Sequence, residues 1–161
     1  MSVKVFLLLL CLCLIFALTA CSLTELLSPL ENEVVASLGK VSSKEFYSSG
    51  GFQDFTDYGI YQFVDSKIEE HKYLKPMTEE DFVTFSNYLE DFEGWVELHD
   101  HTEELYLHYN FDSSIVDIED YFYLYTNPDY HTYGSNNICG SYNMYFFDAQ
   151  SETLFYFHNN I

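Results

Sequence analysis

A stretch of histidines and acids, "VELHDHTEELYLH", has residue types that could bind a metal ion. One residue separates His99 from His101, and Glu97 precedes and Glu103 follows the pair at the same spacing. In an extended chain alternate side chains point to the same side, so these four would form one row. Imidazole and carboxylate groups are ordinary zinc ligands. A turn near residues 100–103 would break the row, and the short spacing favours that alternative, a pair of solvated loop histidines.

A second stretch, "FDSSIVDIED", has carboxylates that would suit calcium. Asp112 and Asp117 are its first acids, and Glu119 and Asp120 follow them. Calcium binds carboxylate oxygens in loops. The spacing does not match that of an EF-hand loop, and the glycine that such a loop needs at its bend is missing. The pattern therefore favours a solvated acidic turn over a calcium site, and we expect no cofactor.

Cys139, in "NNICGSYN", is the one thiol that could act as a nucleophile, with His158 later in the chain. Cell-wall cysteine peptidases share the order Cys then His, but their Cys lies early in the domain within an Asp-Cys-Ser-type motif that is missing here. The sequence also contains no H-E-x-x-H, G-x-S-x-G or P-loop motif. We therefore expect that the protein is not an enzyme.

Tyrosines gather in the second half of the chain and predict a possible binding face. In "YFYLYT", Tyr121, Tyr123 and Tyr125 would share one face of a strand, and Tyr145 would extend the row from another strand. Tyrosine is favoured at binding surfaces because it offers a rigid ring and a hydroxyl group. Such a row could hold a sugar or a peptide strand. The alternative is that other elements cover it.

The segments that must position these residues divide into helices followed by strands. Thr78 and the acids after it resemble a capping box, and apolar residues at spacings of 3 and 4 predict a helix over 79–92 that ends near Gly94. Weaker signals predict helices over 30–38 and from about 57 to 70. Alternating aromatic segments predict strands at 95–98, 104–111, 120–126, 142–148 and 153–159, the last two joined by a polar turn.

This order predicts an α+β fold in which N-terminal helices pack on one face of a C-terminal antiparallel sheet of four to five strands. Aromatic residues make up 19% of the chain, enough to bury a core despite the high charge. The chain has 26 acidic residues against 6 basic ones, and no Lys or Arg follows Lys75. Nucleic acids and anionic lipid surfaces need Lys and Arg, so the charge argues against both as partners.

The first twenty residues have the three parts of a secretory signal peptide. Lys4 supplies a positive charge, and an apolar run from Val5 to Leu18 follows, too short to span a bilayer. The next residues complete Leu18-Thr19-Ala20-Cys21, which resembles a bacterial lipobox. That resemblance implies a diacylglyceryl group on the Cys21 thiol and cleavage before it. Two acyl chains suffice for stable anchoring to the membrane.

The segments "GGFQDFTDY", "EDYFYLYT" and "YNMYFFDAQSETLFYFHNNI" resemble small lipoproteins of Gram-positive gut bacteria. This resemblance covers residues 50–161 and implies location and a single domain, but no activity. We expect a signal peptide over 1–20, a lipidated tether over 21–45 and one domain over 46–161. The expected function is non-catalytic binding of a protein, peptide or glycan at the cell surface. A cell-envelope hydrolase, a metal-dependent accessory enzyme and a protective immunity lipoprotein remain alternatives.

Overall fold

The computed structural model describes residues 29–49, 54–101 and 103–161. The predicted signal peptide and Cys21 lie outside the described residues. The chain divides into two units, Met1–Glu33 and Val34–Ile161, and the whole sheet belongs to the second. None of the helices in the described ranges has both the length and the apolar composition to cross a membrane.

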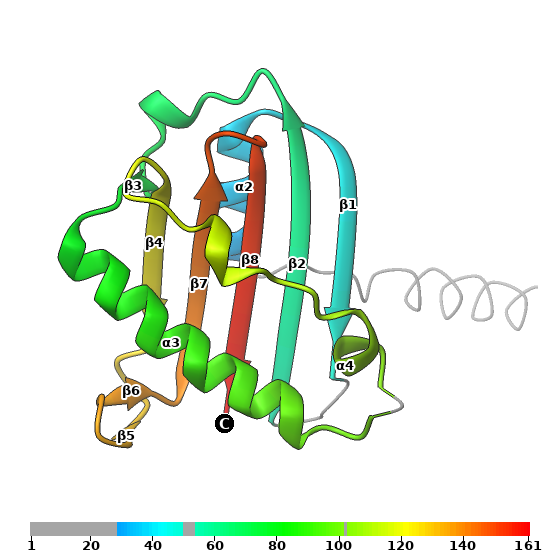
Figure 1. The fold of residues 1–161 in the computed structure, drawn as a ribbon, viewed down its shortest axis with the longest axis vertical. Coiled ribbons are helices and arrows are strands. Elements are labelled where there is room, and N and C mark those ends of the chain that lie inside the picture. The colour runs from blue at the N-terminus through cyan, green and yellow to red at the C-terminus, as the bar shows by residue number, and fades with distance from the viewer. Residues whose placement is uncertain (1–28, 50–53, 102) are drawn as a thin grey trace, which may run out of the picture. The chain divides into compact units, whose positions relative to one another are not determined.

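The described residues contain three α-helices, two 3-10 turns and eight strands (Figure 1). The helices are α2 (Pro29–Leu38), α3 (Glu79–Leu98) and α4 (Glu104–His108), and the 3-10 turns are η1 (Ile68–Glu70) and η2 (Ser113–Ile115). The strands are β1 (Lys40–Ser48), β2 (Phe55–Val64), β3 (Lys75–Pro76), β4 (Tyr121–Thr126), β5 (Thr132–Tyr133), β6 (Ile138–Cys139), β7 (Ser141–Asp148) and β8 (Thr153–Asn160).

Six of these strands form one antiparallel sheet in the order β1-β2-β8-β7-β4-β3, and β5 and β6 form a separate hairpin. The α+β class is confirmed. The predicted four to five strands are too few, and the predicted order of helices before strands is wrong, because the β1–β2 hairpin precedes α3. Residues 40–45, for which we expected part of a tether, lie in the edge strand β1.

Helix α3 crosses one face of the sheet and closes an aromatic core (Figure 1). The ring of Phe92 lies 5.2 Å from that of Phe157 on β8, and Phe85 lies 6.2 Å from the same ring. Tyr58 on β2 lies 5.5 Å from Phe157 on the same side. These rings are almost completely buried, so the aromatic residues of the sequence supply most of the packing volume between helix and sheet.

The second half of α2 lies behind the strands, on the face opposite α3 (Figure 1), so the helices do not share one face as predicted. Val34 and Leu38 are fully buried there. The buried His71 joins this turn of helix to the loop before β3: its Nδ1 accepts a hydrogen bond from the Leu74 N–H at 2.9 Å, and its Nε2 lies 3.1 Å from the Val34 carbonyl. Burial lowers the pKa of His71, which favours the neutral ring that this arrangement requires.

The start of α3 follows its sequence signal, but its end does not. The Thr78 hydroxyl accepts from the Asp81 N–H at 3.2 Å, and the Asp81 carboxylate accepts from the Thr78 N–H at 3.0 Å, which confirms the capping box. The helix then passes Gly94, where we expected it to end, and reaches Leu98. Val96 continues the buried face of the helix four residues after Phe92, and this burial offsets the cost of about 1 kcal/mol for a helical glycine.

Two other segments differ from the prediction because their patterns suit more than one element. Residues 57–64, expected in a helix, belong to β2, where Tyr58 and Tyr61 are buried on opposite faces of a strand inside the sheet. The strand predicted over 104–111 is instead α4 and a following loop. There, Leu105 is buried and Tyr109 packs 5.0 Å from Tyr58, a spacing of four that also suits a helix. The strand predicted over 95–98 is the last turn of α3.

Candidate functional site

The four candidate zinc ligands do not form a row, because the segment that carries them is not extended. His99 lies directly after α3, with its Nε2 3.3 Å from the Thr56 hydroxyl and its Nδ1 3.5 Å from the Glu103 carboxylate. His101 stacks on the Tyr106 ring, with the ring centres 4.2 Å apart. His99 is the C-cap residue of α3 and His101 lies in the turn that follows, where the Glu103 N–H donates to the Asp100 carbonyl at 2.8 Å, so the segment is not the extended strand that the row requires.

The candidate calcium ligands accept hydrogen bonds from the backbone of their own turn. Asp112 accepts from the Ser114 N–H at 2.9 Å, and hydrogen bonding by Ser114 lowers the pKa of this carboxyl. Asp117 accepts from the Glu119 N–H at 3.4 Å, and Asp120 accepts from the Asp117 N–H at 2.8 Å. In the described residues, no three or more His, Cys, Asp or Glu side chains lie close enough to hold a metal ion together.

The tyrosine row is formed, but only one of its four members is more than partly exposed. Tyr121, Tyr123 and Tyr125 lie on the face of β4 that points away from α3, and Tyr145 on β7 is directly opposite Tyr123, with stacked rings 5.8 Å apart. Tyr145 is fully buried, whereas Tyr125 is 41% exposed. Tyr121 and Tyr123 are partly exposed, so Tyr125 is the member of the row most accessible to a ligand.

Cys139 is buried in β6, and its thiol lies 3.3 Å from the Ser141 carbonyl and 3.4 Å from that of Asn127. The Nδ1 atom of His158, the histidine that follows it in the chain, instead lies 2.9 Å from a carboxylate oxygen of Asp57 across β2 and β8. The thiol therefore has backbone carbonyls as its neighbours and lies away from solvent.

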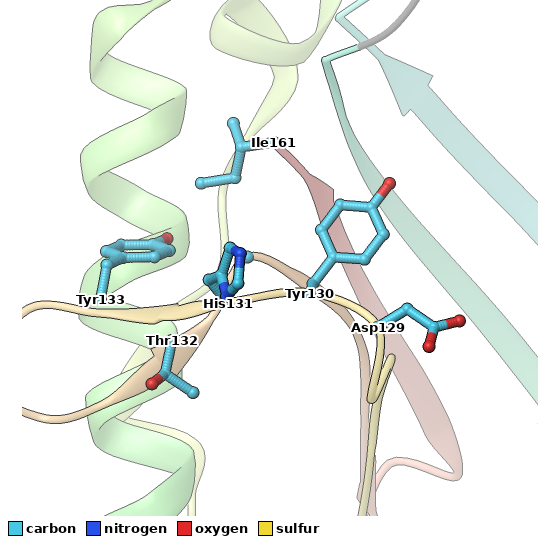
Figure 2. Close-up of a pocket in the computed structure, with 7 residues that line it drawn as sticks. Asp129, Tyr130, His131, Thr132, Tyr133 and Ile161 are labelled. Atoms are coloured by element: carbon cyan, nitrogen blue, oxygen red, sulfur yellow. The ribbon is translucent and has the colours of Figure 1, made fainter.

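The β5–β6 hairpin carries a hollow that the sequence analysis did not identify (Figure 2). Its volume is about 340 Å³. In Figure 2, Tyr133 points toward α3, Tyr130 stands beside the end of β8, and His131 lies between them below Ile161; Asp129 and Thr132 point away. Two aromatic rings, an imidazole and an aliphatic side chain are thus among the groups that line the hollow. The lining residues are Asp129, Tyr130, His131, Thr132, Tyr133, Gly140 and Ile161.

Local turn chemistry shapes this hollow. After β4 the chain turns at Asn127-Pro128, where the Asn127 carbonyl accepts from the Tyr130 N–H at 3.1 Å. Gly140 then joins the hairpin to the end of β8: its N–H donates to the His131 carbonyl at 3.0 Å, and its carbonyl accepts from the Ile161 N–H at 2.9 Å. A Cβ atom at position 140 would lie 3.4 Å from the carbonyl oxygens of His131 and Ile161, a close van der Waals contact.

A half-buried carboxylate attaches the hairpin to α3. The Tyr133 hydroxyl donates to Asp91 Oδ1 at 2.7 Å and accepts from the Trp95 indole N–H at 3.1 Å. The fully buried Tyr142 hydroxyl donates to Asp91 Oδ2 at 3.1 Å. Burial raises the pKa of Asp91, and the hydroxyl donors partly oppose that rise. The hollow therefore lies on a hairpin whose orientation relative to α3 is fixed by charge-assisted hydrogen bonds to Asp91.

Removing the Asp91 carboxylate is expected to destabilise the protein. Asp91→Ala leaves the buried Tyr142 hydroxyl without its carboxylate acceptor, so we expect a loss of about 1–3 kcal/mol in the free energy of unfolding, measured with urea. Asp91→Asn is the matched control, because it keeps one acceptor oxygen, and its loss should be smaller.

The wild type and Asp91→Asn together also test the direction of the Asp91 pKa. A raised pKa means that the folded state holds this proton at a pH where the unfolded state has lost it. Lowering the pH through that range therefore stabilises the wild type relative to Asp91→Asn, which has no such proton. Equal dependence of the two unfolding free energies on pH would show that Asp91 titrates normally.

The residues of this site were missed because they come from distant parts of the chain. Asp91 precedes Tyr133 by 42 positions, and no spacing rule links them. One sequence signal could have indicated the hairpin. The Asn-Pro-Asp turn directly after the predicted strand 120–126 reverses the chain, so the polar and aromatic residues after the turn lie close to the end of that strand. Comparison of this chain with protein-family models, curated proteins and solved structures found no match.

Proposed function

We propose that the protein is held on the outer face of the cell membrane by a lipid on Cys21 and binds a partner there without catalysing a reaction. The observation that carries the binding role is the aromatic hollow on the hairpin. Tyr130 and Tyr133 present rigid rings there, and Asp91 holds Tyr133 in place. Because a side chain of the site is already held in place, less conformational entropy is lost when a ligand binds.

The lining side chains favour binding over hydrolysis. A hydrolase needs a nucleophile, a base and an orienting acid that converge on one point. In Figure 2, the Asp129 carboxylate and the Thr132 hydroxyl point away from the His131 ring. The one free thiol in the described residues, that of Cys139, is buried and does not line the hollow.

The charge of the chain indicates a basic partner. Its 26 acidic residues far outnumber its 6 basic ones, and its net charge is −20. Opposite charge on a partner speeds association and disfavours wrong partners, whereas nucleic acids would be repelled. We therefore propose that the partner is a positively charged protein or peptide. A protective lipoprotein that neutralises a basic toxin is one form of this function.

A defined peptide tests the proposal. The full chain, purified in a non-ionic detergent, is titrated with the octapeptide (Lys-Tyr)4 and with (Glu-Tyr)4 as the charge control. We expect binding of the lysine peptide alone, weakening as salt is added. Tyr130→Ala should weaken it about 2- to 12-fold, the value of one aromatic contact of about 0.5–1.5 kcal/mol.

The matched control is Leu107→Ala. Leu107 is 60% exposed on α4, which contacts β1 at the other edge of the sheet, so its removal should leave the affinity unchanged. Absence of binding to (Lys-Tyr)4 at low salt would contradict the proposal of a basic partner. Equal affinity in Tyr130→Ala and the wild type would place the binding site elsewhere.

A further inference from the structure

The outer edge of β4 is only half covered by its neighbouring strand. Strand β3 consists of Lys75 and Pro76, which pair with Phe122 and Tyr121. In the described part of the chain, the sheet order ends at β3, so no strand lies beyond residues 123–126 of β4. Tyr73, from the segment before β3, packs 5.1 Å from the ring of Tyr123, so the part of the edge that we call open is residues 124–126.

The hydrogen-bonding pattern shows which backbone groups face outward there. The Asn127 N–H donates to the Ser141 carbonyl at the β7 side, whereas the Asp120 carbonyl accepts from the Met77 N–H at the β3 side. Because the direction alternates along an antiparallel strand, odd-numbered residues of β4 bond β7 and even-numbered residues face outward. The N–H and C=O groups of Leu124 and Thr126 therefore point away from β7, beyond the part of the edge that pairs with β3.

The opposite edge of the sheet is protected in ways that β4 is not. Strand β1 has a bulge between Val41 and Ser43, carries Lys40 and Lys44, and contacts α4. Bulges, lysines and covering elements are the usual means of preventing unwanted strand pairing. The segment "YLYT" of β4 has no charge, no proline and strong β propensity, so it can pair with a further strand.

We propose that an extended, positively charged peptide segment adds to the sheet along the open edge of β4. This inference rests on the proposed function and names the form of its partner. Main-chain hydrogen bonds from Leu124 and Thr126 would hold the added strand, and Tyr125, 41% exposed, would contact its side chains. A second copy of this chain is disfavoured as the occupant because each copy carries a net charge of −20.

The hollow lies next to this edge along the chain. Asp129, its first lining residue, comes three residues after Thr126, a span of at most about 11 Å. The hollow also includes Ile161 at the end of β8, and β7 lies between β8 and β4, so an added strand would approach the hollow only where it continues past Thr126 beneath the end of the sheet. The edge would supply affinity through the backbone, and the hollow would select a side chain.

A proline at an outward-facing position tests the edge directly. Thr126→Pro removes an N–H that points away from β7, so the ladder with β7 stays intact, and proline is tolerated on edge strands. Thr126→Val is the matched control because it keeps the N–H. With the full chain in detergent and (Lys-Tyr)4 as probe, we expect at least about tenfold weaker binding for Thr126→Pro and unchanged binding for Thr126→Val.

Hydrogen exchange gives a second measurement that does not depend on a variant. In the wild type the Leu124 and Thr126 amides should exchange more slowly once (Lys-Tyr)4 is bound. A peptide with N-methyl groups on alternate residues should give less protection, because it lacks the donors on one edge. Unchanged exchange at both amides, together with equal affinity in Thr126→Pro and the wild type, would overturn the inference.

The combined results separate the two proposals. Loss of affinity in Tyr130→Ala with no effect of Thr126→Pro would keep the hollow as a binding site and reject strand addition. Binding that neither variant changes is adsorption by charge alone and rejects both. A dimer in sedimentation experiments without peptide, abolished by Thr126→Pro, would make a second copy the occupant and reject the basic peptide.

Discussion

Cells that produce the Cys21→Ser variant are expected to carry no acyl label on this protein, whereas the wild type is labelled. In the proposed anchoring, the Cys21 thiol forms the thioether to the diacylglyceryl group, and cleavage follows on its N-terminal side. A serine hydroxyl does not replace the thiolate nucleophile. The variant should therefore keep residues 1–20, and its intact mass should exceed that of the unlipidated mature chain.

The experiment uses a bacterium that produces lipoproteins, labelled palmitate and intact-mass measurement. The acyl label and the N-terminus are better readouts than membrane fractionation, because a retained apolar segment from Val5 to Leu18 could keep the variant at the membrane. Cys139→Ser is the matched control, since Cys139 is the one other cysteine after residue 21, and its label should be unchanged. A labelled Cys21→Ser protein, or a wild type cut at another residue, would contradict the proposed anchor.

The sequence predicts elements well where one local signal is strong. The start of α3 at Glu79 follows from the Thr78 capping box, and the β7–β8 hairpin follows from two aromatic runs joined by a polar turn. Strand β4 also matches its alternation. In these segments, backbone preference and side-chain burial favour the same structure, so tertiary contacts change little.

Predictions fail where both faces of a strand are buried, because the alternation of apolar and polar residues that marks a strand is then absent. Tyr58 and Tyr61 are buried on opposite faces of β2, so this strand lacks the alternation that marks a half-buried one. Leu105 and Tyr109 suit a helix and a strand equally, and the packing on Tyr58 decides between them. Local pattern cannot contain this information, because it depends on which other elements cover the segment.

The site shows the same limit more strongly. The shared face of Tyr121, Tyr123 and Tyr125 follows from the alternation of a strand, and the structure places Tyr145 opposite Tyr123 in that row. The complete burial of Tyr145 could not be predicted from its own strand, because it depends partly on the Tyr156 ring of β8, which lies 5.1 Å away. The hollow combines the hairpin with the end of β8, and its support comes from Asp91 on a helix, so only the three-dimensional fold assembles it.

Replacing Phe157 by alanine is expected to cost about 3–5 kcal/mol of the free energy of unfolding. Phe157 is fully buried, and its ring lies within 5.5 Å of the rings of Tyr58, Phe92 and Phe111. It thus joins β2, α3 and the loop after α4 in one cluster, and its removal leaves a cavity that rigid aromatic neighbours fill poorly. Since domains are stable by about 5–15 kcal/mol, a large share of the stability would be lost.

Urea unfolding of residues 22–161 measures this effect. We expect the midpoint to fall while the slope of the free energy against urea stays the same, as for a change in native packing alone. Leu98→Ala is the control, because Leu98 is 75% exposed at the end of α3 and its truncation should change stability by no more than about 0.5 kcal/mol. A loss below about 1 kcal/mol for Phe157→Ala would mean that the helix α3 does not depend on this ring for its attachment to the sheet. The hairpin with its hollow, which Asp91 fixes to α3, would then need a different support.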